Sequence, residues 1–287
     1  MNIETPEGQI AVVDVGTGTN VVFVHGTPSS AFEFRHAIAA LKADYRCIAV
    51  DHLGFGNSDK PSGGDYSLAA HQRRFGLAMT ALEVRDAVFV LHDFGTSIAL
   101  AWMLEHPDRV RGVVIANTFL WPATGFLRLI LAFYATSPGR WLYRVANLSA
   151  GILLPWAWGT HRPLTPEVHR GYLEPFLHSE DRHATAALPG ELIGATLTSL
   201  EPRASELGQW PVRAVWGMAD PLVGRNELDR WRGLVPALEV EEVPDAGHFV
   251  ADEAPDAIVR AVNALGEPHV RTTRTHRATD DPRAAQL

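Results

Sequence analysis

Short apolar runs alternate with longer helical patterns through the first 118 residues of the chain. Runs of four or five residues rich in Val, Ile and Ala predict buried strands at 21–24, 47–50, 87–91 and 113–116. The stretches between these runs predict helices at 31–42, 68–82 and 97–105. This alternation is typical of a parallel sheet that helices cover on both faces.

The alternation stops near residue 119. Residues 119–203 show no strand pattern and are rich in Trp, Leu, Ala and Pro, which predicts several short helices. Strand patterns return at 212–216 and 238–243, and a helix is predicted at 255–265. We therefore expect a core formed by 1–118 and 204–266, with 119–203 inserted as a helical cap. Residues 267–287 are polar, and we expect a disordered tail there.

Composition limits the classes of partner. Of the 287 residues, 46% are hydrophobic and 20% charged, which is ordinary for a globular protein. The net charge is −8 and the basic residues form no stripe, so we expect no nucleic acid and no membrane as a partner. The first nine residues lack the apolar core of a signal peptide, and we expect a cytoplasmic protein. The single cysteine, Cys47, lies in an apolar run and is predicted to be a buried, inert thiol.

Unusual polar residues follow the first two predicted strands. The motif His-Gly-Thr-Pro at 25–28 follows the strand at 21–24, and its glycine permits a sharp turn. The amide of Thr27 could then point into a site as one donor of an oxyanion hole. The loop at 51–61 contains Gly54 and Gly56, but it lacks the third glycine and the helix of a dinucleotide site. We interpret it as a structural loop beside the active site.

The motif His-Asp-Phe-Gly at 92–95 lies between a predicted strand and a helix, where a nucleophile elbow would form. Its central residue is Asp93, and Gly95 provides the small residue that an elbow needs. The amide of Phe94 would be the second oxyanion donor. The alternative for Asp93 is a helix N-cap. Ser97 is a rival nucleophile, but it would lie inside the helix, away from the elbow.

Two further candidates follow the late strands. Asp220 comes after the strand at 212–216, and His248 comes after the strand at 238–243. The order Asp93, Asp220, His248 is nucleophile, acid, base, each just beyond a strand, which is the order of an α/β-hydrolase triad. A non-catalytic protein that binds a ligand on the same scaffold is the alternative from another functional class.

These motifs resemble the haloalkane dehalogenase and epoxide hydrolase branch of the α/β-hydrolases, over residues 10–120 and 205–265. The likeness lies in Gly-Phe-Gly-Asn-Ser-Asp-Lys-Pro at 54–61, His-Asp-Phe-Gly at 92–95, Gly-Met-Ala-Asp at 217–220 and Asp-Ala-Gly-His-Phe-Val at 245–250. It implies the α/β-hydrolase fold, a mostly parallel central sheet with helices on both faces and an inserted helical cap. Asn117 is no carboxylate, which also favours Asp220 as the acid.

The resemblance also implies a mechanism. Asp93 would displace a leaving group from a saturated carbon of a small apolar substrate and form an alkyl ester. His248, oriented by Asp220, would then activate water as the co-substrate. The mechanism requires no metal and no organic cofactor.

The leaving group stays open between halide and oxygen. Dehalogenases hold the halide with a Trp after the nucleophile and a second donor, whereas this chain has Phe94, which lacks an N–H group, and Thr27, which offers only a hydroxyl. Substitute halide donors could be Trp121, Trp156 or Trp158, and proton donors for an epoxide could be Tyr134, Tyr143 or Tyr172. Each could instead pack in the cap. Haloalkane dehalogenation is our first prediction and epoxide hydrolysis our second, and ester or lactone hydrolysis is a further alternative. The sequence predicts no oligomeric state.

Overall fold

The computed structural model describes residues 1–266, so the expected tail at 267–287 lies outside the described part. An eight-stranded sheet forms its centre, in the order β1-β2-β4-β3-β5-β6-β7-β8. The strands are β1 (Asn2–Thr5), β2 (Gly8–Val15), β3 (Thr19–Val24), β4 (Tyr45–Val50), β5 (Ala87–Asp93), β6 (Val110–Thr118), β7 (Val212–Gly217) and β8 (Glu239–Val243).

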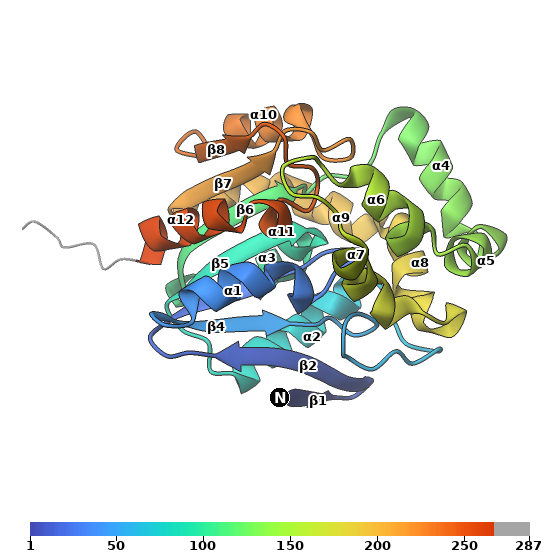
Figure 1. Ribbon diagram of the computed structural model, residues 1–287, viewed down its shortest axis with the longest axis horizontal. Helices are drawn as coiled ribbons and strands as arrows, with labels where there is room; N and C mark the ends of the chain where they lie inside the picture. Colours follow the sequence, from blue (N-terminus) through green and yellow to red (C-terminus); the bar gives the residue numbers. More distant parts are fainter. Residues whose placement is uncertain (267–287) are drawn as a thin grey trace, which may run out of the picture.

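Helices connect the strands and cover the sheet (Figure 1). The α-helices are α1 (Arg35–Leu41), α2 (Leu68–Ala81), α3 (Phe94–Glu105), α4 (Gly125–Ala135), α5 (Ser137–Val145), α6 (Leu154–Ala157), α7 (Pro166–Leu173), α8 (His183–Glu191), α9 (Ala195–Leu200), α10 (Arg225–Leu234), α11 (Val250–Glu253) and α12 (Pro255–Gly266). Shorter or irregular helical segments are η1 (Ala31–Phe34), η2 (Pro107–Arg109), η3 (Leu148–Leu153), η4 (Glu174–Phe176), η5 (Ser179–Arg182) and η6 (Glu201–Gln209).

The predicted parallel sheet is confirmed for β3 to β8, which pair in parallel. The sequence pattern missed β1 and β2, which pair antiparallel with each other and with β4. They lie at one edge of the sheet and alternate buried with exposed residues, so they lack the continuous apolar run of the inner strands. The helix expected from residue 97 begins at Phe94, because the chain turns into α3 directly after Asp93.

Side chains of the inner strands point alternately to two cores. On β5, Val88 and Val90 belong to the core beneath α1 and α12. Phe89 and Leu91 belong to the core on the opposite face, which α2 and α3 cover. Cys47 is buried in the first of these cores, and burial raises the pKa of its thiol to about 12.

The segment between β6 and β7 contains only helices in the described structure, from α4 through η6. Figure 1 shows these helices gathered beyond one end of the sheet, with α4 and α5 at the outer edge of the molecule. In Figure 1, β4 runs toward this end of the sheet, and β3, β5, β6 and β7 run parallel to it. The loops that carry the candidate residues therefore lie between the sheet and the helices.

Candidate active site

Asp93 ends β5 in a strained backbone conformation. Its φ is 50° and its ψ is −124°, a region that residues with a side chain rarely adopt. Such a turn between a strand and a helix exposes the side chain at its apex. The hydroxyl of Thr118 donates to the Asp93 carbonyl at 2.6 Å and supports the turn from the neighbouring strand. The alternative of a helix N-cap is not seen, since the Asp93 side chain makes no capping hydrogen bond.

Two glycines leave room for this elbow. A Cβ atom on Gly95 would overlap the carbonyl oxygen of Val24, so α3 could not approach β3 as closely with any other residue there. A Cβ atom on Gly26 would overlap the Asp93 carboxylate itself. The elbow therefore depends on close backbone packing on both sides of Asp93.

The Asp93 carboxylate faces one backbone donor and one imidazole. The Thr27 N–H donates to Asp93 Oδ2 at 2.8 Å. On the other side, His248 Nε2 lies 3.9 Å from Asp93 Oδ1, beyond hydrogen-bond distance. The Phe94 amide belongs to the first turn of α3, whose N–H groups have no partner within the helix. Of the two expected oxyanion donors, the Thr27 amide thus contacts the carboxylate, and the Phe94 amide follows Asp93 directly in the chain.

Asp220 and His248 form a buried ion pair. His248 Nδ1 lies 2.8 Å from Asp220 Oδ2. Burial lowers the pKa of His248, but the charge and hydrogen bond of Asp220 and the charge of Asp93 outweigh it and raise that pKa to about 9. Burial conversely raises the pKa of Asp220, but the charge and hydrogen bond of His248 lower it overall. Asp220 therefore holds the ring with Nε2 toward Asp93.

Asn117 completes the surroundings of Asp220. It is the next-to-last residue of β6, with a φ of 30°, and its Nδ2 group donates to Asp220 Oδ2 at 2.9 Å. Its Oδ1 accepts the N–H of Gly217 at 2.8 Å, which fixes the amide orientation. Asn117 thus acts on the acid as a hydrogen-bond donor.

The loop at 51–61 is held together by Asp51. Its Oδ1 accepts the N–H of Ala31 at 2.7 Å, and its Oδ2 accepts the N–H of Asn57 at 2.8 Å. The His25 ring joins this loop to the preceding one, because its Nε2 accepts the N–H of His52 at 3.0 Å. The interpretation of this loop as structural agrees with these contacts.

Sequence reasoning missed a buried Glu33 and overlooked its partner His92. His92 Nδ1 lies 3.1 Å from both carboxylate oxygens of Glu33, and His92 Nε2 lies 2.9 Å from the carbonyl oxygen of His248. Both ring nitrogens thus face acceptors. His92 precedes Asp93 directly, so this bond links the elbow to the backbone of the base. A glutamate within an apolar helical pattern was the available signal.

Glu253 was also missed. Its two carboxylate oxygens accept the N–H groups of Gly159, at 3.0 Å, and Gly247, at 2.9 Å. These bonds fasten the loop after α6 to the turn that precedes His248. Burial raises the pKa of Glu253 to about 7, although the two backbone bonds lower it.

The three tryptophan candidates differ in their surroundings. The Trp158 indole donates to the carbonyl of Arg162 at 2.7 Å, and Trp156 is 58% exposed. Trp121 packs against the ring of Trp231 and beneath the guanidinium of Arg230. Phe94 packs edge-on against Phe119.

The tyrosine candidates behave differently from one another. Tyr134 and Tyr143 pack edge to face, with ring centroids 5.3 Å apart. Burial, the charge of Asp93 and the neighbouring Tyr134 raise the pKa of Tyr143 to about 12, although a hydrogen bond with Ser149 lowers it. Tyr143 therefore lies close enough to Asp93 to feel its charge and keeps its proton. Tyr172 instead donates its hydroxyl to Asp252 at 2.8 Å. Ser97 is buried inside α3, and its hydroxyl has no hydrogen-bond partner among residues 1–266.

Comparison with known proteins identifies relatives over nearly the whole chain. The family model described as the alpha/beta hydrolase fold matches residues 19–255. Haloalkane dehalogenase 2 of Mycobacterium tuberculosis is 32% identical over 265 residues, covering 90% of this chain and 92% of the relative. A cis-3-alkyl-4-alkyloxetan-2-one decarboxylase of Shewanella oneidensis is 30% identical over 260 residues, covering 86% and 81%.

A solved structure agrees with these relatives. The haloalkane dehalogenase of Agrobacterium tumefaciens C58 superposes with a TM-score of 0.81 at 28% identity, covering 92% of this chain and 94% of the other. The chain therefore belongs to the α/β-hydrolase family, in its haloalkane dehalogenase-like branch.

Proposed function

We propose that this hydrolase breaks a bond at a saturated carbon through a covalent alkyl ester on Asp93, with haloalkanes as its first substrate class. The observation that carries the proposal is the placement of Asp93 between the Thr27 N–H, at 2.8 Å, and His248 Nε2, at 3.9 Å. The kinship with haloalkane dehalogenases supports the substrate class.

The two oxygens of Asp93 have different roles in this mechanism. Oδ2 already accepts the Thr27 N–H, so Oδ1 is the oxygen free to attack the substrate carbon. The leaving group departs with the bonding electrons, and an ester remains on Asp93. When water adds to the ester carbon, the Thr27 and Phe94 amides stabilise the charge on the carbonyl oxygen. One such donor contributes roughly 3–4 kcal/mol.

His248 acts in the second step. Formation of the ester removes the negative charge of Asp93, which is one of the causes of the raised pKa of His248. The pKa therefore falls once the alkyl-enzyme has formed, the ring releases its proton to solvent, and the neutral ring becomes a base for the attacking water. The proton passes to Nε2, while Asp220 stabilises the resulting imidazolium through Nδ1.

Epoxide hydrolysis is the second candidate, and the Tyr134–Tyr143 pair favours it. An epoxide leaves as an alkoxide, which needs a proton donor, and Tyr143 keeps its proton with a pKa of about 12. The relative named for cis-3-alkyl-4-alkyloxetan-2-ones also acts on a strained oxygen ring. An oxygen leaving group thus has a donor within the helices that cover the site.

Replacement of the base should trap the intermediate. In His248→Gln, hydrolysis of the ester should slow by roughly 10²- to 10⁴-fold, while attack by Asp93 continues. After incubation with 1,2-dibromoethane or styrene oxide, mass spectrometry should show the alkyl adduct on the peptide that contains Asp93. The double variant Asp93→Asn/His248→Gln is the control and should show none. A turned-over substrate that leaves no adduct on the single variant would contradict the covalent mechanism.

Removal of the acid should change the titration of the base. In Asp220→Asn the ring loses the charge that raises its pKa, while burial continues to lower it, so the pKa of His248 should fall well below 9. Measurement by NMR titration of the free enzyme, with His248→Gln used to assign the signal, tests this. An unchanged pKa would show that Asp220 does not raise the pKa of His248.

Substitution of the phenols should separate the two candidate reactions. In Tyr134→Phe and Tyr143→Phe, diol formation from styrene oxide should fall by about 10²-fold through loss of the proton donor. Bromide release from 1,2-dibromoethane should change little. Tyr172→Phe is the matched control, because its hydroxyl is bound to Asp252. Equal losses of both activities would assign the phenols to packing, and diol formation without bromide release would place epoxide hydrolysis first.

A further inference from the structure

The outermost helices expose an unusual number of large apolar side chains. Among the described residues, 16 large hydrophobic side chains are exposed, and 8 of them lie on α4 and α5. We call these eight the outer cap surface: Phe126, Leu127, Leu129, Ile130, Phe133, Trp141, Leu142 and Val145. Phe126 is 77% exposed, and Leu131 is the only buried residue of α4. Such an apolar cluster marks an interaction site in a soluble protein.

The charge of the same helices is opposite to that of the whole chain. No aspartate or glutamate occurs from residue 109 to residue 166, although the net charge of the chain is −8. The two helices contain three arginines, Arg128, Arg140 and Arg144. Among the described residues, Arg128 and Arg140 form no ion pair, and Arg144 bonds to His183 at 2.7 Å. The positive charges of Arg128 and Arg140 are therefore available to bind an anion.

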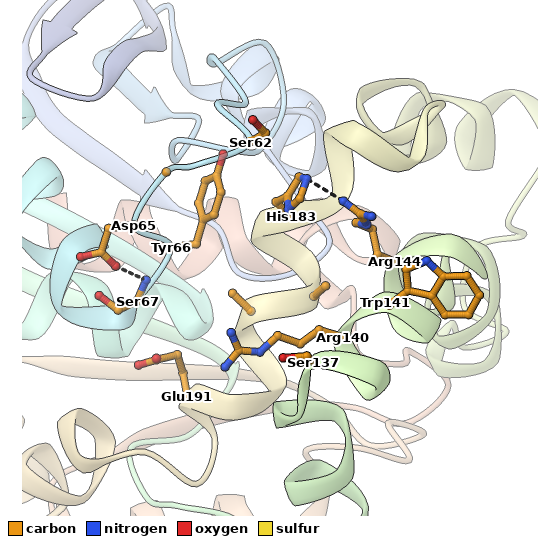
Figure 2. A pocket seen from close by; sticks show the side chains of 13 residues that line it. Ser62, Asp65, Tyr66, Ser67, Ser137, Arg140, Trp141, Arg144, His183 and Glu191 are labelled. Carbon is orange, nitrogen blue, oxygen red and sulfur yellow. Dashed lines mark hydrogen bonds between the residues drawn. The ribbon is translucent and has the colours of Figure 1, made fainter.

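A groove of about 600 Å³ adjoins the outer cap surface, between α5, α8 and residues 62–67. Figure 2 shows Arg140, Trp141 and Arg144 along its edge. Two carboxylates also line the groove but have partners of their own. Asp65 accepts the N–H of Ser67 at 3.0 Å, and Glu191 accepts the N–H of Leu68 at 3.0 Å. Cationic and aromatic groups thus stand together beside the apolar helices.

We propose that the outer cap surface binds the surface of an anionic phospholipid bilayer. Apolar side chains of α4 would enter the boundary between headgroups and acyl chains, and the arginines would bind lipid phosphates. A partly exposed Trp such as Trp141 is suited to this boundary, because its ring is apolar and its N–H is polar. No described helix is long and apolar enough to cross a membrane, so the contact is with one leaflet.

The charge pattern separates a bilayer from a second copy of the chain. A twofold dimer would place this surface against its own equivalent, arginines against arginines, without a carboxylate in the two helices to offset them. The sequence at 267–287 is polar and contains four arginines, so it complements neither the apolar side chains nor the positive charge of the outer cap surface. An anionic bilayer matches both properties. The net charge of the chain predicts no membrane partner, whereas the local charge of α4 and α5, with three arginines and no carboxylate, favours one.

The same helices connect this surface to the candidate site. Tyr134 of α4 and Tyr143 of α5 contact each other behind the outer cap surface, and Tyr143 feels the charge of Asp93. An apolar substrate dissolved in the bilayer would therefore meet the enzyme at the helices that cover its active site. Binding to the bilayer does not depend on the proposed chemistry.

Cosedimentation with vesicles tests the proposal. The full chain should bind vesicles of equimolar phosphatidylcholine and phosphatidylglycerol more tightly than pure phosphatidylcholine, and added salt should weaken the binding. Arg128→Gln/Arg140→Gln should bind roughly 25-fold more weakly, at about fivefold for each arginine. Phe126→Ser/Leu129→Ser should lose roughly tenfold or more. All variants should keep the activity of the parent on a short, water-soluble substrate.

The matched control is Leu77→Ser, which removes an exposed leucine from α2, a helix that lies outside the segment between β6 and β7. It should bind the mixed vesicles as the parent does. Absence of vesicle binding, or equal binding to vesicles without phosphatidylglycerol, would overturn the proposal. A dimer in sedimentation that is lost in Phe126→Ser/Leu129→Ser, without vesicle binding, would assign the surface to a second copy instead.

Discussion

The left-handed backbone of Asp93 is the constraint on which the site depends. A residue with a side chain in such a conformation costs of order 1–3 kcal/mol, so the surrounding fold must hold it there. β5 is buried along its whole length and pairs with β3 and β6, while α3 packs into the core behind it. Gly26 and Gly95 allow the neighbouring backbone to approach. The two buried cores on either side of the sheet thus hold the Asp93 carboxylate in place.

Three buried charges share this small space, and their balance decides the chemistry. Asp93 and Asp220 lie on opposite sides of the His248 ring, at 3.9 Å and 2.8 Å from its nitrogens. Asn117 donates to Oδ2 of Asp220, the oxygen that faces His248, and the Leu222 N–H donates to Oδ1, so this acid is oriented as well as charged. Neutralisation of Asp93 by alkylation would shift the charge balance around His248. His248, paired with Asp220, can thus hold a proton before Asp93 attacks the substrate and accept one when water attacks the ester.

Sequence reasoning could predict the parallel sheet, because inner strands are continuous apolar runs with helices between them. It could also predict that Asp93, Asp220 and His248 lie close together, because parallel strands bring their ends to one edge. The edge strands β1 and β2 escaped because only three of their twelve residues are buried, so they contain no continuous apolar run. Glu33 and Glu253 escaped because their roles depend on contacts far along the chain, to His92 and to Gly159. The pairing of Tyr134 with Tyr143 was likewise unpredictable, because it depends on how α4 packs against α5.

In the proposed mechanism, oxygen from water reaches the product only by way of the Asp93 carboxylate. A single turnover in water labelled with the heavy oxygen isotope tests this directly, by mass spectrometry of the product and of the peptide that contains Asp93. The alkyl-ester mechanism predicts that the label enters Asp93 and that the first product carries unlabelled oxygen. Label in the product of the first turnover, with none in the peptide, would show that water attacks the substrate directly and would contradict the mechanism.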